Sequence, residues 1–413
     1  MEKETFFFKK EQSMMCRKKS FLVVLLCLLL GGVCPSLGSH SDSKNDNDTV
    51  LRTHDNDSDS PSPFGPLALF ASLSDSHSHS LSVSHSKNDN DSSSPFGPSA
   101  GGACLAAQEG MGAKVVFYNV ENLFDCRHDS LRDDYEFLPE GRRRWTPWRM
   151  QEKVRHIAQV VTAIGTDVAP MLVGLAEVEN DSVMTLLTGH SLLRGAGYRY
   201  VMSEGDDPRG IDIALMYRPS LFHLLGTRAC PVPVREVRAE AHARPILYAW
   251  GELTNGDTLH VVVCHWPSRL EGRRRTEPLR QRAADVVTGL VDSIRTVCPQ
   301  AYIVVMGDLN ETPEGEAVQS LPLENVTRSL GGTYRYRGRW EQLDQLLVSP
   351  SLLDEASSVH VAAEGAQVFS EPFVLEREPL YGGYRPRRTY QGPRYWGGYS
   401  DHLPVYVRVE ISW

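Results

Sequence analysis

From about Lys114 to the C-terminus, short apolar runs alternate with polar segments, and several of the runs end in polar residues. Short apolar runs bounded by polar or turn-forming residues are typical of buried strands. Such runs predict strands at 114–120, 171–179, 211–219, 259–266, 301–310, 343–349 and 403–410. The runs are too short for long buried helices, so each predicts one strand of a sheet.

Two segments have the spacing of an amphipathic helix instead. In 148–165 the apolar residues at this spacing are Val154, Ile157, Ala158, Val161 and Ile164. In the second segment, from about Glu277 to Val297, they are Ala283, Val286, Val287, Leu290, Ile294 and Val297. Apolar residues every three or four positions form one face of a helix that packs on a core. Because predicted strands outnumber predicted helices, we expect a mixed α/β domain with a substantial sheet core.

The N-terminal region resembles an export signal. Arg17-Lys18-Lys19 precede an apolar run of 13 residues from Phe21 to Val33, and Ser36 to Gly38 supply small residues for a cleavage point. This order predicts a secretory signal within residues 1–38 and an exported protein. An uncleaved anchor is the alternative. The run is shorter than the about 20 residues of a membrane-spanning helix, so no stable membrane span is expected.

Residues 39–112 form a polar segment rich in Ser, Asp, Asn and His. The peptide SKNDND occurs at 43–48 and 86–91, and SPFGP occurs at 62–66 and 94–98. Such a composition cannot bury enough apolar surface to offset chain entropy, which predicts a disordered linker. Weak metal binding by the histidines is the alternative to a solvated tether. The folded domain is therefore predicted to span residues 113–413.

Composition narrows the class of protein only a little. The chain has 41% hydrophobic and 23% charged residues, which is typical of a soluble globular protein. Its net charge of −9 gives no overall attraction to nucleic acids or anionic membranes. Five of the eight cysteines follow the predicted signal, and their spacing matches no zinc motif. We expect a monomer.

The polar residues that end four predicted strands are the candidates for chemistry. They are Asn119 and Glu121, Glu177 and Glu179, His265, and Asp308 and Asn310. Residues i and i+2 of an extended chain face the same side, so each pair can present two polar groups at one place. One such pair is most simply a turn, but four polar strand ends favour a site. Carboxylate and amide oxygens without thiols suit Mg²⁺ or Ca²⁺ better than zinc.

A further motif, Ser400-Asp401-His402, lies just before the last predicted strand. The motifs GLAEVEN (174–180), CHWPS (264–268) and GDLNETP (307–313) precede it in the chain. This order of motifs resembles that of the endonuclease/exonuclease/phosphatase superfamily, and the resemblance extends from Lys114 to the C-terminus. That superfamily includes pancreatic deoxyribonuclease, abasic-site endonucleases, neutral sphingomyelinases and inositol-polyphosphate 5-phosphatases. The resemblance implies a metal-dependent hydrolase of phosphate esters, folded as a four-layer α/β sandwich of two mixed β-sheets flanked by helices.

The resemblance also implies roles for the carboxylates and amides. Glu177 resembles the principal metal ligand, assisted by Asn119, Glu121 and Asp401, and the implied ion is Mg²⁺, with Mn²⁺ or Ca²⁺ as alternatives. Asp308 and Asn310 resemble the pair that orients the attacking water and holds the scissile phosphate, to which Asn119 contributes.

The remaining implied roles concern the histidines and one arginine. His402 resembles the catalytic histidine, with Asp344 as its orienting acid. His265 resembles a second histidine that faces the phosphate, with Asp212 as its carboxylate partner. Arg244 resembles an arginine that contacts the phosphate. Either His402 or Asp308 removes the proton of the attacking water, and the sequence leaves both open.

Three arginine-rich segments bear on the substrate. GRRRWTPWR (141–149) and YGGYRPRRTYQGPRYWGGYSDHLP (381–404) combine arginines with aromatic residues, and GRRR (272–275) follows His265. Single-strand binders use arginine for phosphates and aromatic faces for bases, although such a loop can also pack on itself. The prediction is a nuclease for nucleic-acid phosphodiesters. A phosphatase or phospholipase C-like enzyme for inositol phosphates or sphingomyelin is the alternative. A binding module without activity is a third, which the intact polar set disfavours.

Overall fold

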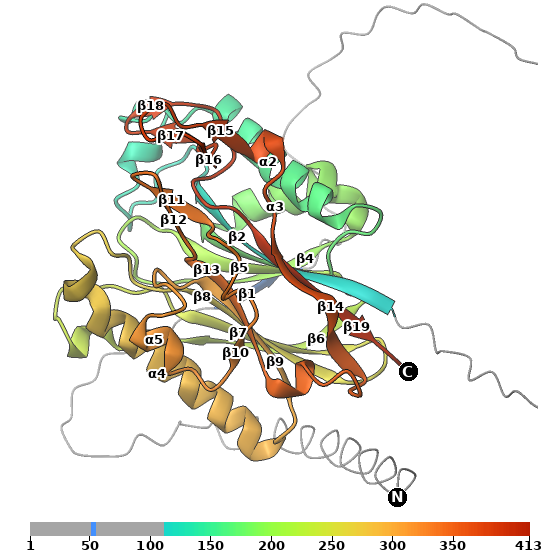
Figure 1. The fold of residues 1–413 in the computed structure, drawn as a ribbon. Helices are drawn as coiled ribbons and strands as arrows, with labels where there is room; N and C mark the ends of the chain where they lie inside the picture. The colour runs from blue at the N-terminus through green and yellow to red at the C-terminus, as the bar shows by residue number, and fades with distance from the viewer. Residues whose placement is uncertain (1–50, 55–110) are drawn as a thin grey trace, which may run out of the picture. The chain divides into compact units, whose positions relative to one another are not determined.

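The computed structural model describes residues 111–413 and the backbone of residues 51–54. The predicted signal lies outside the described residues, as does the predicted linker except for 51–54 and 111–112. The described part of the domain is built around two large β-sheets (Figure 1).

The first sheet has seven strands in the order β1-β4-β5-β3-β2-β19-β14. They are β1 (Leu51–His54), β2 (Met111–Leu123), β3 (Leu172–Val178), β4 (Arg199–Ser203), β5 (Asp212–Tyr217), β14 (Val359–Val368) and β19 (Val405–Ile411). The second has six strands in the order β10-β13-β9-β8-β7-β6. They are β6 (Phe222–Cys230), β7 (Ile246–Leu253), β8 (Thr258–His265), β9 (Tyr302–Asp308), β10 (Glu324–Asn325) and β13 (Asp344–Val348). Both sheets are mixed, because β2 pairs with β3 and β8 with β9 in parallel, whereas the other neighbours are antiparallel.

The two sheets pack face to face, and β3 illustrates how. Leu172 and Ala176 point into the core between the sheets, whereas Val173 and Leu175 point to the opposite face. Gly174 marks a close approach, because a Cβ there would lie 3.0 Å from Met306 Sδ of the facing sheet. Side chains alternate along a strand, so a strand buried on both faces is apolar at nearly every position.

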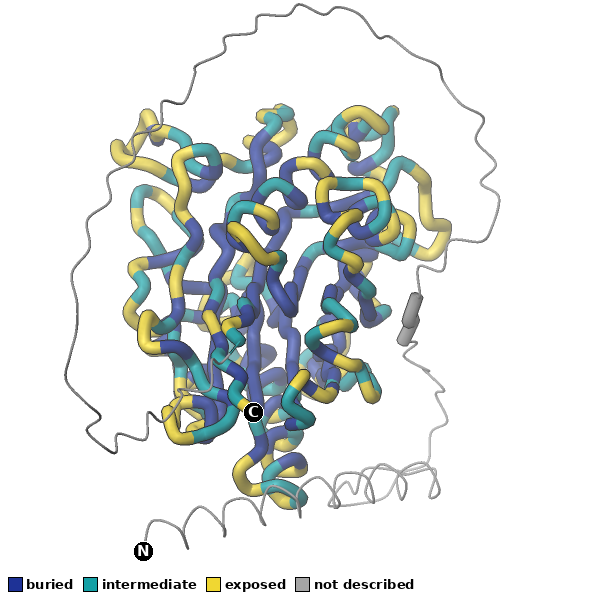
Figure 2. Tube along the Cα trace, turned by 90° about the vertical axis from the view of Figure 1, so that its right-hand side faces the viewer, coloured by how far each residue is buried: buried dark blue, intermediate teal, exposed yellow. Residues whose placement is uncertain are grey.

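Helices cover the outer faces of both sheets. α2 (Pro147–Gly165) and α3 (Asp181–Gly189) pack on the seven-stranded sheet, and α4 (Arg273–Val297) and α5 (Glu316–Gln319) pack on the six-stranded one. Buried positions follow these layers through the middle of the molecule (Figure 2). The predicted four-layer sandwich is confirmed. One boundary was wrong: α4 begins at Arg273 and not near Glu277, so the GRRR segment opens the helix.

Shorter elements complete the described chain. The 3₁₀ helices are η1 (Tyr135–Phe137), η2 (Leu192–Ala196), η3 (Val234–Glu236), η4 (Pro350–Leu352) and η5 (Pro372–Val374). Three small hairpins lie at one end of the sandwich, at the top of Figure 1. They pair β11 (Tyr334–Tyr336) with β12 (Arg339–Glu341), β15 (Leu375–Arg377) with β16 (Tyr384–Pro386), and β17 (Tyr390–Gln391) with β18 (Arg394–Tyr395). In the part of the chain that the structure describes, no helix has both the length and the apolar character needed to cross a bilayer.

Candidate active site

Neighbouring strands bring polar residues together at one end of the sandwich. His265, at the end of β8, pairs in register with Asp308 at the end of β9, and Asp308 pairs with Asp344 at the start of β13. Asn119 of β2 and Glu177 of β3 reach the same place from the facing sheet. Asn119 Nδ2 lies 3.0 Å from Asp308 Oδ2 and 3.4 Å from Glu177 Oε1. Both sheets therefore contribute to one site.

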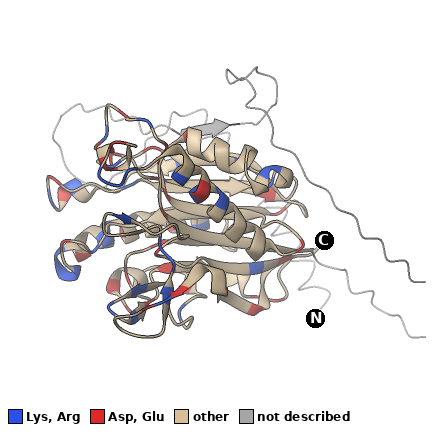
Figure 3. Ribbon diagram, turned by 90° about the horizontal axis from the view of Figure 1, so that it is seen from above, with Lys and Arg blue, Asp and Glu red and all other residues tan. Residues whose placement is uncertain are grey.

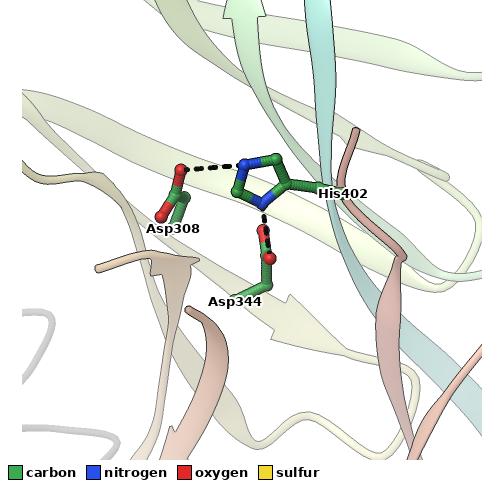
Figure 4. Close-up of side chains that lie close together, drawn as sticks. All are labelled: Asp308, Asp344 and His402. Carbon is green, nitrogen blue, oxygen red and sulfur yellow. Dashed lines mark hydrogen bonds and ion pairs between the residues drawn. The ribbon is translucent and has the colours of Figure 1, made fainter. Parts of the chain in front are cut away.

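His402 and Asp344, predicted as a pair, are hydrogen-bonded. His402 Nδ1 donates to Asp344 Oδ2 over 2.7 Å, Thr333 Oγ1 donates to the same oxygen over 2.5 Å, and His402 Nε2 lies 3.8 Å from Asp308 Oδ2 (Figure 4). Burial by itself lowers the pKa of His402, but the Asp344 and Asp308 carboxylates outweigh burial and raise the pKa well above its usual value. The two carboxylates therefore favour the protonated form of His402, which has a proton to donate and no free nitrogen to accept one.

Asp308 lies close to both histidines through one carboxylate oxygen. Its Oδ2 lies 3.6 Å from His265 Nε2, and its Oδ1 accepts a hydrogen bond from Asn310 N over 2.9 Å. Burial raises the pKa of Asp308 to about 6, while His402 acts against the rise and Asp344 adds to it. The carboxylate is thus mostly ionised at neutral pH, yet it is basic enough to accept a proton from a group beside it.

Strained backbone is concentrated at the same place. Among the described non-glycine residues with positive φ, four belong to this region: Glu121 (53°), Asn122 (59°), Glu177 (67°) and Asn310 (48°). The pairing of β2 with β3 is interrupted between Asn119 and Leu123, and that of β3 with β5 is interrupted at Glu177. Left-handed non-glycine residues cost about 1–3 kcal/mol each and persist where the surroundings hold them, often at functional sites.

These irregularities change the directions expected for the acidic strand ends. The alternation rule predicted that Glu177 and Glu179 face the same side. Instead, Glu177 Oε2 accepts from Asn122 N over 3.0 Å, and Glu179 Oε2 accepts from Asp125 N over 2.6 Å. The left-handed residue at a bulge breaks the alternation of the strand. The prediction was wrong for this pair, and Glu177 alone faces the site.

His265 is neutral and faces two carboxylates. Burial, helped by Arg244 and Arg209, lowers the pKa of His265 well below its usual value. Its Nε2 lies 3.9 Å from Glu177 Oε1 and 3.6 Å from Asp308 Oδ2. Its Nδ1 has no hydrogen-bond partner among the described residues.

Two predicted neighbours of His265 have other partners. Arg244, expected on the phosphate, is buried and donates to Asp207 Oδ2 over 2.8 Å and to the His265 carbonyl over 3.4 Å. Asp212, expected on His265, accepts from Gly205 N over 2.8 Å instead. The predicted Asp212–His265 pair is not formed, because Asp212 opens β5 of the other sheet and closes the turn before that strand. Asp207, which was not predicted, belongs to the same turn and fixes Arg244.

Glu121 and Asp401 form a second acidic group, beside two cations. Asp401 is ion-paired with Arg388, and Arg388 Nε lies 4.0 Å from Glu121 Oε1. Lys153 of α2 is buried below the same carboxylates and donates to Thr389 Oγ1 and to the Tyr399 carbonyl, both over 2.5 Å. Burial lowers the pKa of Lys153 to about 8, against the effect of Glu121 and Asp401. Burial and Asp401 raise the pKa of Glu121 to about 7.

Neither cation of this group was predicted. Lys153 had a signal in the sequence, since it lies on the apolar face of the helix, one turn before Ile157. Arg388 belongs to the segment 381–404 that was expected to bear on the substrate, but its pairing with Asp401 had no signal, because it depends on how the loop before Asp401 folds back. We call Glu121, Asp401, Lys153 and Arg388 the cation half of the site. Glu177, His265, Asp308, Asp344 and His402 are the histidine half.

The two halves differ in formal charge, which tests whether a metal fits. In the cation half two carboxylates face two cations. In the histidine half three carboxylates face one imidazolium, because His265 is neutral. Two negative charges are therefore unbalanced, and most of the potential metal-ligand atoms in this half are carboxylate oxygens. A divalent cation such as Mg²⁺ or Mn²⁺ fits this half.

The predicted metal ligands are divided between the halves. Glu177 belongs to the histidine half, whereas Glu121 accepts from Thr389 N over 2.6 Å and Asp401 is bound to Arg388. Asn119 directs its amide N–H groups toward Glu177 and Asp308. Asp308, Asp344 and His402 also have ligand atoms within 4.8 Å of one another. A protonated His402 cannot ligate, so Glu177 and Asp308 are the better donors.

Two arginines of α4 hold the loop that follows β9. Glu311 is buried and its carboxylate accepts from Arg280 Nε over 3.0 Å and from Arg273 Nη2 over 2.6 Å. Asn310 Nδ2 donates to the Trp266 carbonyl over 3.1 Å. The first arginine of the GRRR segment thus supports the loop that carries Asp308 and Asn310, rather than standing free at the surface.

Loops rich in arginine and aromatic residues border the site. Tyr334 of β11 lies with its ring centroid 4.9 Å from that of His402, and Arg388 joins the same border to Asp401. Residues 141–149, 334–341 and 375–396 make up this border, which we call the arginine–aromatic rim. Its parts contact one another: Arg335 donates to the Tyr384 carbonyl over 2.6 Å, and Tyr390 donates to the Arg143 carbonyl over 3.0 Å.

Comparison with known proteins agrees with this geometry. A model of the "Endonuclease/Exonuclease/phosphatase family" matches residues 114–411. No curated protein matches the chain.

Several solved structures are similar in fold. Humanised TDP2 of D. rerio, with 14 mutations, is 16% identical with a TM-score of 0.47, over 72% of this chain and 98% of that one. An endonuclease/exonuclease/phosphatase family protein from Bacteroides thetaiotaomicron is 17% identical with a TM-score of 0.46, over 74% and 100% of the two chains. The human Nocturnin catalytic domain is 16% identical with a TM-score of 0.46, over 73% and 95%.

Proposed function

Because the chain belongs to the endonuclease/exonuclease/phosphatase family, we propose that it is an exported, divalent-metal-dependent nuclease that hydrolyses phosphodiester bonds of nucleic acids. Members of this family hydrolyse phosphate esters, so the proposal concerns the substrate, the metal and the location. One observation carries it: the histidine half combines a protonated His402 with two unbalanced negative charges. Such a site can bind a divalent cation and still offer a proton to a leaving oxygen.

The positions of the two proton carriers suggest their roles. Asp308 orients the attacking water, and the carboxylate oxygen that the ion leaves free would accept the proton of that water. His402 already holds a proton, so it stabilises the charged phosphate and protonates the leaving oxygen. Asp344 holds the His402 ring through the 2.7 Å hydrogen bond. His265 Nε2 faces the same Asp308 oxygen as His402 Nε2.

We assign the metal to the histidine half. Glu177, together with Asp308, would hold a divalent cation, and the ion would stabilise negative charge on the phosphate oxygens. Glu121 and Asp401, which sequence similarity placed among the ligands, instead bind Arg388 and lie beside Lys153. We therefore assign these two acids to positioning the loop that ends at His402.

The rim supports nucleic acid as the substrate. Its three segments contain twelve arginines and three glutamates, with no lysine and no aspartate, whereas the whole chain has a net charge of −9. An arginine-rich border beside a phosphoesterase site favours a substrate with several phosphates in a row, because the rim arginines that are not paired with Glu136, Glu376, Glu378 or Asp401 can each bind one of them. A single phosphate, as in sphingomyelin, would use only a small part of this charge.

Export rests on the N-terminal signal pattern in residues 1–38. Cys298 is disulfide-bonded, which also supports an oxidising location. Fractionation of cells that express the full chain with a C-terminal tag tests this part. Protein found only in the cytoplasm with an intact N-terminus contradicts export and leaves the enzymatic proposal unaffected.

An assay with competing substrates tests the enzymatic part. The purified protein is incubated with DNA, RNA, sphingomyelin and inositol phosphates, with Mg²⁺, Mn²⁺, Ca²⁺ or EDTA. We expect cleavage of nucleic acid that needs a divalent ion and is lost in His402→Ala. If both nucleic acids survive while sphingomyelin or an inositol phosphate is turned over, the nuclease proposal is wrong.

A further inference from the structure

Exposed aromatic side chains gather on the arginine–aromatic rim. Seven aromatic side chains are exposed among the described residues, and five of them belong to the rim. These are Trp148 (61% exposed), Tyr336 (54%), Tyr384 (52%), Tyr381 (49%) and Trp396 (39%). Large rings left in water on one part of a surface indicate a binding surface, because scattered single residues would need no explanation.

Self-packing accounts for part of the rim but not for these rings. Trp145 and Tyr390 are buried, with ring centroids 6.1 Å apart, so they form a small core of the rim. Trp148 lies at the edge of Tyr395, at 6.2 Å, and Trp396 donates through Nε1 to Glu376 over 2.5 Å. These contacts fix the rings in place and leave part of each ring in solvent. The rings are therefore positioned for a partner.

Arginines stack on rings of the rim, both on exposed rings and on the half-buried Tyr395. The guanidinium carbon of Arg149 lies 4.3 Å from the Tyr395 ring centroid, and those of Arg394 and Arg337 lie 5.1 Å and 5.2 Å from the centroids of Trp396 and Tyr336. Figure 3 looks down on this end of the sandwich and shows blue segments along its loops. Arginine is the cation that can stack on a ring and bind a phosphate with the same planar group.

We propose that the rim binds a single strand of nucleic acid, with unpaired bases stacked on Trp148 and Trp396 and phosphates on the neighbouring arginines. Bases in a duplex stack on each other and offer no free faces, so exposed rings gain nothing from a paired substrate. This proposal rests on the proposed nuclease function and specifies its substrate. The strand leads into the site through Tyr334, which packs on His402, and Arg388, which binds Asp401.

Binding without cleavage tests the proposal directly. One fluorescent oligonucleotide, offered as a single strand and as a blunt duplex, is titrated with the full chain in EDTA, and anisotropy gives the Kd. We expect the single strand to bind at least about tenfold more tightly than the duplex. Trp148→Ala and Trp396→Ala should each weaken single-strand binding by about 5- to 100-fold, and Trp→Phe at either position should restore most of it.

Two controls separate stacking from other effects. Trp413→Ala removes a ring that is 58% exposed but lies outside the rim, and should leave both Kd values unchanged. Arg142→Ala changes an exposed arginine of the rim. It should weaken the binding of both the single strand and the duplex, and reduce the salt dependence of binding by about one counterion. Vesicles of anionic phospholipid serve as the third ligand, because Leu380 is also exposed beside Tyr381.

The binding experiment can contradict the single-strand proposal separately from the nuclease proposal. Equal binding of duplex and single strand, or tryptophan variants that bind like the wild type, overturns the single-strand proposal even if Mg²⁺-dependent cleavage is observed. Vesicles that bind as tightly as the single strand and depend on the same tryptophans also overturn it. Tight, tryptophan-dependent single-strand binding without any cleavage contradicts the nuclease function and supports the binding surface.

Discussion

The two halves of the site contain similar acids in different surroundings. In the cation half, Asp401 is bound by Arg388. Burial raises the pKa of Asp401, but Arg388, His402 and Lys153 together outweigh burial and lower it. In the histidine half, Asp308 has no lysine or arginine partner within salt-bridge distance among the described residues, and burial raises its pKa to about 6. Both aspartates are largely buried and both come from motifs typical of the family. Their partners, and not their identity, separate them.

This difference indicates where charge is left for chemistry. A carboxylate held by a guanidinium is already neutralised and contributes mainly to the position of the chain. A buried carboxylate without such a partner favours any added positive charge, whether a proton or a metal ion. We therefore assign metal binding and proton transfer to the histidine half, and to the cation half the positioning of the loop that presents His402.

The largest expected effect separates the two halves by rate. His402→Ala removes the proton donor and should lower kcat on nucleic acid by about 10²–10⁴-fold, with an unchanged circular dichroism spectrum. Arg388→Gln, in the cation half, should lower kcat by less than about tenfold, because it acts through position only. Stopped assays at saturating substrate measure both. His190→Ala, in an exposed histidine that follows the last residue of α3, serves as the control.

The second prediction compares metal binding by two glutamates. Glu177→Gln should raise the Kd for Mn²⁺ by about 10- to 100-fold, because it removes a charged ligand from the half with unbalanced negative charge. Glu121→Gln should change this Kd by less than about threefold, since its carboxylate accepts backbone hydrogen bonds from Thr389 and Tyr390. Titration calorimetry measures both. Similar losses of Mn²⁺ affinity in the two variants would indicate that Glu121 is also a metal ligand.

The third prediction concerns stability and not rate. Arg388→Gln leaves Asp401 with no arginine, which should lower the free energy of unfolding by about 1–3 kcal/mol at pH 7. Arg388 lowers the pKa of Asp401, so its contribution is present above the unfolded pKa and is lost as the pH falls through the folded pKa. The difference from the wild type should therefore shrink in acid. Urea unfolding at pH 7 and pH 2.5, below the lowered pKa of Asp401, measures it, with Arg142→Gln as the exposed control.

Much of the fold could be predicted from the sequence, because buried strands are apolar at nearly every position. All seven predicted runs contain strands of the two sheets. Among the strands that were missed, β7 is mostly buried and apolar, whereas β6 and β14 are less apolar or irregular. β6 lies at a sheet edge with exposed residues along its length, and β14 contains a shift in register between Val361 and Ala366. An edge strand has no continuous apolar run to detect.

The site was predictable where side chains follow directly from strand ends. His265, Asp308 and Asp344 lie in register across three strands, so their meeting depends only on strand pairing. Lys153 and Arg388 were missed because they meet only when the loop from Thr389 to Tyr399 folds onto α2. The direction of Glu179 was missed because a left-handed Glu177 is a property of the folded sheet. The alternation of side-chain directions expected along a strand does not predict where a bulge will form.

The smallest effect on rate is expected at Asp212, which has neither a cation in hydrogen-bond contact nor a place beside His265. Asp212→Asn should keep kcat within about threefold of the wild type, because its carboxylate only closes the turn from Gly205. Burial raises the pKa of Asp212 to about 7, so its folded form binds a proton that the unfolded form releases. Its stabilising contribution is complete below the unfolded pKa and is lost as the pH rises through about 7. The variant should therefore lose less stability than the wild type between pH 4 and pH 8 in thermal unfolding scans. A loss of kcat of about 100-fold or more would place Asp212 on His265 after all and extend the histidine half by a fourth carboxylate.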